Sequence, residues 1–375
     1  MDPSSATAAS GVLAFGAAYS FLAIALVLGG LIFFHELGHF LAAKALRVGV
    51  KTFSLGFGPR LFSFRKGTTE YQLAAIPLGG FVSMVGESDP RDIPEPFTEE
   101  DSFSLRTPWQ RFVIIVAGPL FNLVLAWAIY WGVFYANGQE FLIPEVGSVM
   151  KDSPAMRADI RQGDRIIEIN GVTIERWDEL VAGVMESRGS DMALTVQRGK
   201  EVLVTTATPS PFSRKTIFGE EKTSWAIGLT PSGAKGIMHF GFFDAAGQGV
   251  NHAIAITRLI GQSLVKMFER VVPLESMGGP IRIAKEIHTQ AQSGSITGIL
   301  MLAAFISLNL GLLNLLPVPV LDGGHIVFLL FEMIRRKPAS EQFQEYSIRI
   351  GVALLLGLMV FVTYNDISKW IMGEL

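Results

Sequence analysis

The chain has 375 residues, of which 49% are hydrophobic and 17% are charged, and its mean hydropathy is +0.39. This composition is typical of a membrane-embedded protein that carries some soluble mass. A net charge of −3 gives no sign of a nucleic-acid partner, and the absence of cysteine excludes disulfides, iron–sulfur clusters and thiolate zinc sites. Any metal must therefore be held by His, Asp or Glu.

The first apolar segment, at about 11–45, is predicted to cross a bilayer. We expect it to be retained, because the amino terminus "MDPSSATAAS" lacks the basic region of a cleaved signal peptide. No charged residue occurs from Pro3 to Phe34, and the segment then reaches "HELGH" at 35–39. Ionisable side chains are costly inside a membrane and usually functional there.

The spacing of this motif predicts a metal site. His35 and His39 are four residues apart, so a helix places both imidazoles on one face, as two ligands of one zinc ion require. Glu36 lies beside them, where it can act as a general base toward a water molecule at the metal. An accidental match or an interior polar cluster is the alternative, but burial in a membrane makes it the less favoured one.

Three further segments, at about 112–135, 298–316 and 348–366, are predicted to span, although the last is short. Basic residues follow the first span and also separate the third from the fourth. Under the positive-inside rule both groups are cytoplasmic, and both termini are external. The acidic, proline-rich run 87–101 is expected to be a flexible part of the cytoplasmic loop.

The segment between the second and third spans is predicted to be external and to hold two parts. Within 137–210, short Val and Ile runs alternate with turns, and this stretch resembles a PDZ domain. Its Gly163-Asp164 and Asn170-Gly171 pairs stand where such domains carry turn motifs, whereas Ala158-Asp159 departs from the common Ala-Gly pair. The second part, 211–297, is expected to be an amphipathic helical linker.

A catalytic zinc needs a third protein ligand, and the helix after "HELGH" offers none. Asp322 is the favoured candidate, because it follows the uncharged third span at a point where prolines and glycines break the helix. His325 stays open as an alternative ligand, or as a partner that orients the Asp322 carboxylate. Asn122 and Asn314 are expected to form interhelical hydrogen bonds, and Asn314 is close enough to Asp322 to hold substrate instead.

Together, "HELGH", "NLLPVPVLDGG" and the PDZ-like insert resemble the site-2 protease family of intramembrane zinc metalloproteases, and within it the bacterial regulator-of-sigma-E-protease branch. Further matches are "FSLGFGPRL", "IPLGGFVSMVGE", "GPLFN" and "GGPIRIAKE". The chain departs from the enterobacterial members in having one PDZ-like stretch where they have two.

The resemblance implies a polytopic α-helical membrane protein with about four transmembrane helices, an inserted PDZ-like β-rich domain and a membrane-associated β-hairpin. The helices fall in two halves, 1–136 and 298–375. His35, His39 and Asp322 would bind Zn²⁺, and Glu36 would activate water. The re-entrant hairpin at about 50–86 would lend an edge strand within 71–85 to an extended substrate, with Gly79, Gly80 and Phe81 as substrate-binding residues. A soluble cytoplasmic hairpin is the alternative.

The same resemblance implies the substrates and the compartment. The enzyme would sit in the bacterial cytoplasmic (inner) membrane, with its active site within the bilayer nearer the cytoplasm. It would cleave within or near transmembrane segments of single-pass proteins. These are anti-sigma factors already trimmed by a site-1-type protease, or signal-peptide remnants.

Two other functions stay open from the sequence. One is a membrane-anchored zinc peptidase that acts on soluble or misfolded proteins, which the position of the cut in the substrate would reveal. The other is a non-catalytic scaffold that uses only the PDZ-like domain. The intact His-Glu-His set argues against it.

Overall fold

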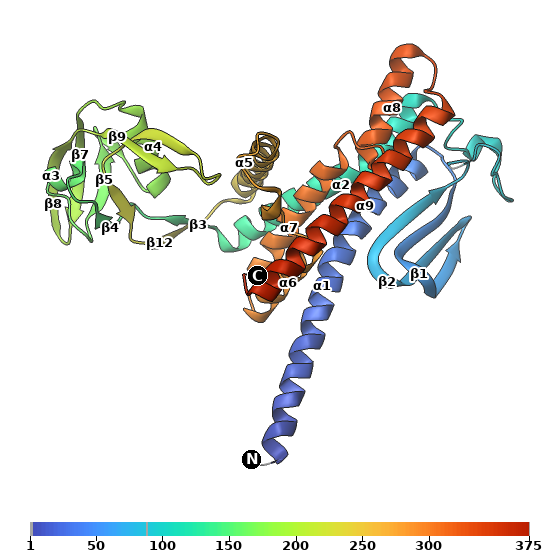
Figure 1. Ribbon diagram of the computed structural model, residues 1–375, viewed down its shortest axis with the longest axis horizontal. Coiled ribbons are helices and arrows are strands. Elements are labelled where there is room, and N and C mark those ends of the chain that lie inside the picture. Colours follow the sequence, from blue (N-terminus) through green and yellow to red (C-terminus); the bar gives the residue numbers. More distant parts are fainter. Residues whose placement is uncertain (1–2, 88, 375) are drawn as a thin grey trace. The chain divides into compact units, whose positions relative to one another are not determined.

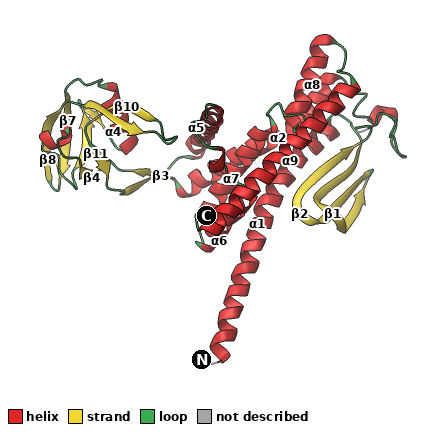
Figure 2. Cartoon of the chain, in the orientation of Figure 1, coloured by secondary structure: helices red, strands yellow, loops and turns green. Residues whose placement is uncertain are grey.

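The computed structural model describes residues 3–87 and 89–374, and their side chains except at 3–19, 77, 78 and 214. The chain divides into a helical unit, residues 1–133, 246–261 and 274–375, and a β-rich unit, residues 134–245 and 262–273. Figure 2 shows strands in two places, beside the long helices and in the β-rich unit.

Four helices of the described chain are long and apolar enough to cross a membrane, which confirms the predicted class of helical membrane protein. They are α1 (Pro3–Ala45, with its span at Ser20–Ala45), α2 (Pro108–Asn137), α7 (Ile296–Asn314) and α9 (Glu341–Met372). Helix α9 is longer than the segment predicted at 348–366, because charged turns extend it at both ends of its apolar stretch.

Shorter helices complete the helical part of the fold. They are α5 (Phe242–Phe268), α6 (Pro280–Gln292) and α8 (Asp322–Arg335), with single 3₁₀ turns at Glu99–Asp101 and Leu274–Ser276. Helix α6 packs against α1, α7 and α9, and Figure 1 shows it beside them.

The amino end of α6 is capped by a carboxylate from α9. Asp366 is 1% exposed and accepts hydrogen bonds from the backbone N–H groups of Gly279, Ile281 and Arg282 at 3.0–3.1 Å. An anion at a helix N-terminus satisfies donors that the helix itself leaves unpaired. A Cβ on Gly279 would lie 2.5 Å from Asp366 Oδ2, so the glycine in "GGPIRIAKE" is required by this close approach.

Strands β1 (Val50–Lys66) and β2 (Thr69–Met84) form an antiparallel hairpin whose strands are bent, so that each is paired along two different stretches. Ser54 pairs with both Gln72 and Phe81, and Gln72 also pairs with Ser63. The two bent strands therefore form a sheet of four strand segments, which lie side by side in the order 80–84, 50–55, 70–73 and 62–66. The sheet packs on the end of α1 through a core that includes Ala43, Val50, Val82 and Met84.

This register shows that only part of 71–85, the edge expected from the sequence, lies at a free edge of the sheet. Gln72 and Leu73 have strand partners on both sides, Ser54 and Ser63 for one and Leu55 and Phe62 for the other, so they lie inside the sheet. The free edges are the segments 80–84 and 62–66. The sequence does not reveal the second pairing, because it depends on bulges where the register shifts between Leu55 and Phe62.

The β-rich unit is built around a four-stranded antiparallel sheet in the order β6-β5-β7-β8. Its strands are β5 (Arg165–Ile169), β6 (Val172–Thr173), β7 (Met192–Arg198) and β8 (Glu201–Ala207), and its helices are α3 (Pro154–Arg157) and α4 (Trp177–Glu186). Ile166, Leu180, Met192 and Leu194 lie in the core at 2% exposure or less. Asn170 and Gly171 both have positive φ, as the tight turn between β5 and β6 requires. We refer to this unit as the PDZ-like domain.

The PDZ-like domain extends past the predicted boundary at 210, and the following segment is not wholly helical. Four strands come after it: β9 (Ser210–Lys215), β10 (Glu221–Ala226), β11 (Leu229–Pro231) and β12 (Lys235–Met238). Strand β11 pairs with β4 (Val146–Val149) and β12 with β3 (Gln139–Leu142). Buried Ile227 belongs to the domain core. The chain thus returns to complete the domain, and α5 begins only at Phe242.

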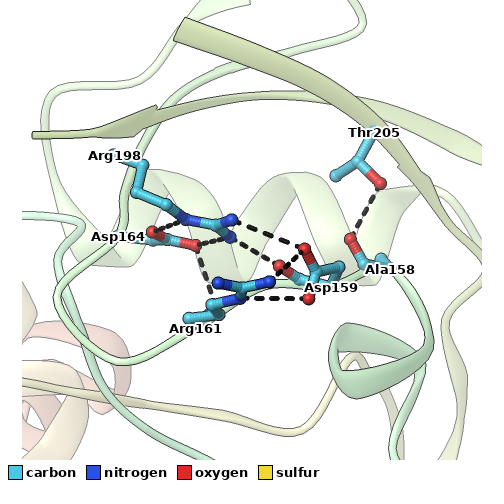
Figure 3. A network of polar contacts seen from close by, with 6 residues as sticks. All are labelled: Ala158, Asp159, Arg161, Asp164, Arg198 and Thr205. Carbon is cyan, nitrogen blue, oxygen red and sulfur yellow. Dashed lines mark hydrogen bonds and ion pairs between the residues drawn. The ribbon is translucent and has the colours of Figure 1, made fainter. Parts of the chain in front are cut away.

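A network of charged side chains explains the departure at Ala158-Asp159 (Figure 3). Asp159 has a φ of +55°, the left-handed conformation that favours glycine. Its carboxylate accepts hydrogen bonds from Arg161 at 3.0 and 3.1 Å and from Arg198 at 3.4 Å. Arg198 also donates two hydrogen bonds of 2.8 Å to Asp164, which is 1% exposed. Residue 159 therefore holds Arg198 over a buried carboxylate through its backbone carbonyl at 2.6 Å and its side chain at 3.4 Å, and glycine would lose only the side-chain contact.

The Arg198→Met substitution should lower the melting temperature of a fragment covering 138–240, because it leaves the Asp164 carboxylate with only the Arg161 N–H, at 2.8 Å. Burial raises the pKa of Asp164, but the hydrogen bonds and charge of Arg198 and the Arg161 N–H outweigh this and lower it. The pair therefore stabilises the fold above the unfolded-state pKa of about 3.9, and this contribution fades as pH falls.

Thermal unfolding between pH 3 and pH 7 measures both effects. The loss of stability on acidification should be shallower in Arg198→Met than in the wild type. Lys200→Met, an exposed change in the same strand connection, is the matched control and should follow the wild-type curve. Parallel curves for Arg198→Met and the wild type would contradict the assignment.

Candidate active site

The two histidines of "HELGH" face the interior of the helical unit from adjacent turns of α1. His35 is 8% and His39 is 9% exposed, and their Nε2 atoms lie 3.3 Å apart. Helical geometry stacks residues i and i+4, and the rings meet edge to face with centroids 4.9 Å apart. Both Nε2 lone pairs therefore converge on one point.

Asp322 reaches the same point from the first turn of α8. Helix α7 ends at Asn314, and a turn containing Pro317 and Pro319 separates it from α8. This turn is tight. A Cβ on Gly323 would lie 2.2 Å from Leu316 O, and one on Gly324 would lie 2.4 Å from Val318 O. The two glycines allow the chain to fold back, and the fold places Asp322 against α1.

The distances among the three residues fit a tetrahedral metal ion. His35 Nε2 lies 3.2 Å from Asp322 Oδ2, and His39 Nε2 lies 3.6 Å from Asp322 Oδ1. Tetrahedral zinc with bonds of about 2.1 Å has ligands about 3.4 Å apart. Among the described residues, these three form the group of His, Asp or Glu side chains whose ligand atoms lie within 4.8 Å of one another. His325 does not belong to this group.

A buried atom without a partner provides an independent test of the fit. Asn122 on α2 is fully buried, and its amide nitrogen lies 3.2 Å from His35 Nδ1 while its Oδ1 has no hydrogen-bond partner. A half-turn of the amide places Oδ1 against His35 Nδ1, where it accepts the ring N–H. That arrangement satisfies Asn122 and leaves His35 Nε2 unprotonated, which is the state that binds metal.

His39 is held in the same tautomer by α2. Its Nδ1 lies 2.9 Å from the backbone carbonyl of Ile114, so Nδ1 donates and Nε2 keeps its lone pair. The close crossing of α1 and α2 makes this contact possible. A Cβ on Gly38 would lie 2.3 Å from Ala117 O, and one on Gly118 would lie 2.2 Å from His39 Nε2. Both glycines are therefore required for the ring to reach its position.

Glu36 and the edge of the hairpin sheet meet in a cavity of about 300 Å³ beside the three candidate ligands. A Cβ on Gly80 would lie 3.2 Å from Glu36 Cγ, and Phe81 lines the cavity. Gly79 does not face Glu36. It packs against the Phe57 ring, and a Cβ at this position would overlap that ring. His325 and Glu87 also line the cavity.

Asn314 lies against His35 and does not face the cavity. Its amide nitrogen is 3.4 Å from His35 Nε2 and 3.5 Å from Nδ1. It is the last residue of α7. The expected interhelical contact of Asn122 is the one between its side-chain amide and His35 on α1, and its backbone carbonyl also accepts a hydrogen bond of 2.8 Å from Ser307 on α7.

Comparison with known proteins identifies the family. The family model described as peptidase family M50 matches residues 23–358. The chain belongs to this family. M50 is the site-2 protease family, so the chain is a zinc metallopeptidase, a hydrolase that uses Zn²⁺, embedded in a membrane.

Relatives along nearly the whole chain carry matching names. A protein of Campylobacter jejuni, provisionally named a zinc metalloprotease, is 38% identical over 355 residues, which cover 94% of each chain. Similarly named proteins of Agrobacterium fabrum and Clostridium perfringens are 34% and 36% identical, covering 92% and 91% of this chain and 95% and 96% of theirs. Among solved structures, the PDZ domain of an SdrC-like protein of Listeria monocytogenes covers 23% of this chain and 84% of its own, at 22% identity and a TM-score of 0.19.

Three contributors to the site were not identified as such from the sequence. They are the carbonyl of Ile114, the glycine at 118 and the carboxylate of Glu87. Gly118 did leave a signal, because a Gly-Pro pair inside an apolar span weakens the helix unless close packing needs it. A backbone carbonyl leaves no such signal.

The Gly118→Ala substitution should lower zinc content, because the added methyl group would occupy the position of His39 Nε2. Alanine favours helix over glycine by about 1 kcal/mol, so α2 itself should persist. Metal analysis of the purified protein, with circular dichroism for helix content, measures both. Gly132→Ala is the matched control on the same helix, since a Cβ there meets nothing within 4 Å. Equal zinc content in the two variants would contradict the packing argument.

Proposed function

We propose that His35, His39 and Asp322 hold the zinc ion and that Glu36 is the general base of an intramembrane endopeptidase. The convergence of three ligand atoms from α1 and α8 within an apolar helical unit carries this proposal. A membrane-buried charge cluster without a bound cation would be costly. The Asn122 and Ile114 contacts support it further, because both leave Nε2 free to bind metal.

The residues of the cavity suggest how a peptide bond is cleaved there. A bound zinc ion supplies a Lewis acid that polarises the substrate carbonyl. Glu36 takes a proton from the attacking water and returns it to the amide nitrogen of the leaving strand. Gly80 has no side chain, so the sheet edge packs directly against α1: a Cβ there would lie 3.2 Å from Glu36 Cγ and 3.3 Å from Ile32 Cγ2.

An extended substrate would bind along the sheet edge at 80–84. A transmembrane helix shields its peptide groups and must unwind before water can attack. The 80–84 edge has a strand partner on one side only and leads past Glu36, so it can pair with the unwound chain, which would compete with Glu36 and Glu87 for the Val82 and Met84 N–H groups. The hairpin also exposes Phe57, Leu61, Phe62 and Ile76 at 46–68%, which supports its contact with lipid.

Orientation and partners follow from the chain's own charges and from the family. The basic residues after α1 and those between α8 and α9 support a cytoplasmic location of those ends. The relatives are bacterial proteins, which supports the inner membrane. We infer the regulator-of-sigma-E-protease branch, with single-pass anti-sigma factors trimmed by a site-1-type protease, or signal-peptide remnants, as substrates. The PDZ-like domain, in which no metal-binding group is found among the described residues, would filter them.

Glu36→Gln should keep zinc and lose turnover, because the ligands remain while the base is gone. General bases contribute roughly 10²–10⁴-fold to rate. Cleavage of a single-pass reporter in detergent, measured alongside zinc content, tests this. Asp322→Asn should lose or weaken zinc, and a fully loaded, active Asp322→Asn enzyme would reject Asp322 as the third ligand.

Single proline substitutions at Phe81, Val82 and Ser83 test whether substrate pairs with the 80–84 edge. Proline removes one backbone donor, so the variant whose N–H points away from β1 should slow cleavage roughly two- to tenfold, the loss of one net hydrogen bond. Proline at Ser63 or Phe64, on the opposite free edge, is the control and should leave cleavage unchanged. If every zinc-loaded variant of the 80–84 edge cleaves a helical reporter at the wild-type rate, the substrate binds elsewhere.

A further inference from the structure

One carboxylate in the catalytic cavity has no part in the proposed mechanism. The cavity lining includes three acids, Glu36, Asp322 and Glu87, and no lysine or arginine. Asp322 is assigned to the metal and Glu36 to the proton transfer. Glu87 therefore remains as a carboxyl group facing the space where substrate binds.

Glu87 is anchored at the end of the sheet edge. Its Oε2 accepts a hydrogen bond of 3.1 Å from the backbone N–H of Met84. Within the described chain no ion pair neutralises Glu87, and the nearby Lys51 is engaged with Asp92 at 2.6 Å. One carboxylate oxygen is thus fixed by the backbone. Burial raises the pKa of Glu87, and Lys51 opposes this from nearby without forming an ion pair with it.

The edge runs from the catalytic carboxylate toward the basic end of α1. Gly80 lies against Glu36, whereas Met84 pairs with Val50, just past the end of α1. Strands rise about 3.3 Å per residue, so the two ends of the edge are about 13 Å apart. In the proposed orientation the Met84 end is cytoplasmic.

We propose that Glu87 forms a subsite for a lysine or arginine side chain of the substrate, three or four residues from the scissile bond on its cytoplasmic side. This inference rests on the proposed function and specifies its substrate class. Single-pass proteins carry lysine and arginine at the cytoplasmic ends of their spans. Their long side chains can extend from the membrane to an interfacial carboxylate. The two positive charges of a bound zinc ion are balanced by the carboxylates of Asp322 and Glu36. Glu87 is therefore available for a second cation.

A competition experiment tests the subsite. Three single-pass reporters differ only in carrying Lys, Gln or Glu at the fourth residue from the cut, which mass spectrometry of the products locates. The wild-type enzyme should cleave the Lys reporter about fivefold faster than the Glu reporter. This ratio corresponds to about 1 kcal/mol, the upper range for a partly exposed ion pair. Glu87→Gln keeps an acceptor for the Met84 N–H and should abolish the preference, and Glu87→Lys should invert it.

Zinc content and the rate of cleavage of the neutral Gln reporter show whether a variant is structurally damaged. A change confined to the charged reporters indicates charge recognition. Glu95→Gln, an exposed change in the same loop, is the matched control and should keep the wild-type preference. Equal slowing of all three reporters by Glu87→Gln would overturn the subsite and leave Glu87 as a cap of Met84. A wild-type enzyme that cleaves all three reporters equally would overturn it too. One that cleaves none would overturn the proposed function itself.

Discussion

Two imidazole rings in an apolar helix need a partner for every nitrogen, and the arrangement of the helical unit follows from this requirement. Water is absent from the bilayer core, so an unsatisfied polar atom there costs several kcal/mol. Asn122 and the Ile114 carbonyl lie against the two Nδ1 atoms. Both Nε2 atoms are left facing Asp322, and a cation bound between these three side chains would complete the set.

Helix packing serves this arrangement at each point of contact. Gly38 and Gly118 bring α1 and α2 close enough for the Ile114 carbonyl to reach His39. The glycines after Asp322 let α8 fold back on the end of α7. Arg111 on α2 forms a 2.6 Å ion pair with Glu332 on α8, and both side chains are largely buried. This pair ties the helix that carries Asp322 to the helix that orients the histidines.

The parts of the site that the sequence predicts are those with a local signature. The i, i+4 spacing of His35 and His39 identifies a helix face, and the proline- and glycine-rich break identifies Asp322. What it does not predict depends on distant segments. The partner of Asn122 could not be named, because nothing in the sequence aligns α2 with α1. The pairing of Ser54 with two strand segments depends on bulges, and the PDZ-like domain is completed by strands that return from beyond its predicted end.

Two imidazoles and one carboxylate are the ligands proposed for the metal. Zinc K-edge X-ray absorption on the purified enzyme tests this assignment directly, because outer-shell scattering counts imidazole rings. The account predicts nitrogen and oxygen ligands at about 2.0–2.1 Å, two imidazole rings, and an unchanged spectrum in His325→Ala. A spectrum that requires three imidazole rings, one of which is lost in His325→Ala, would contradict the account and put His325 in the place of Asp322.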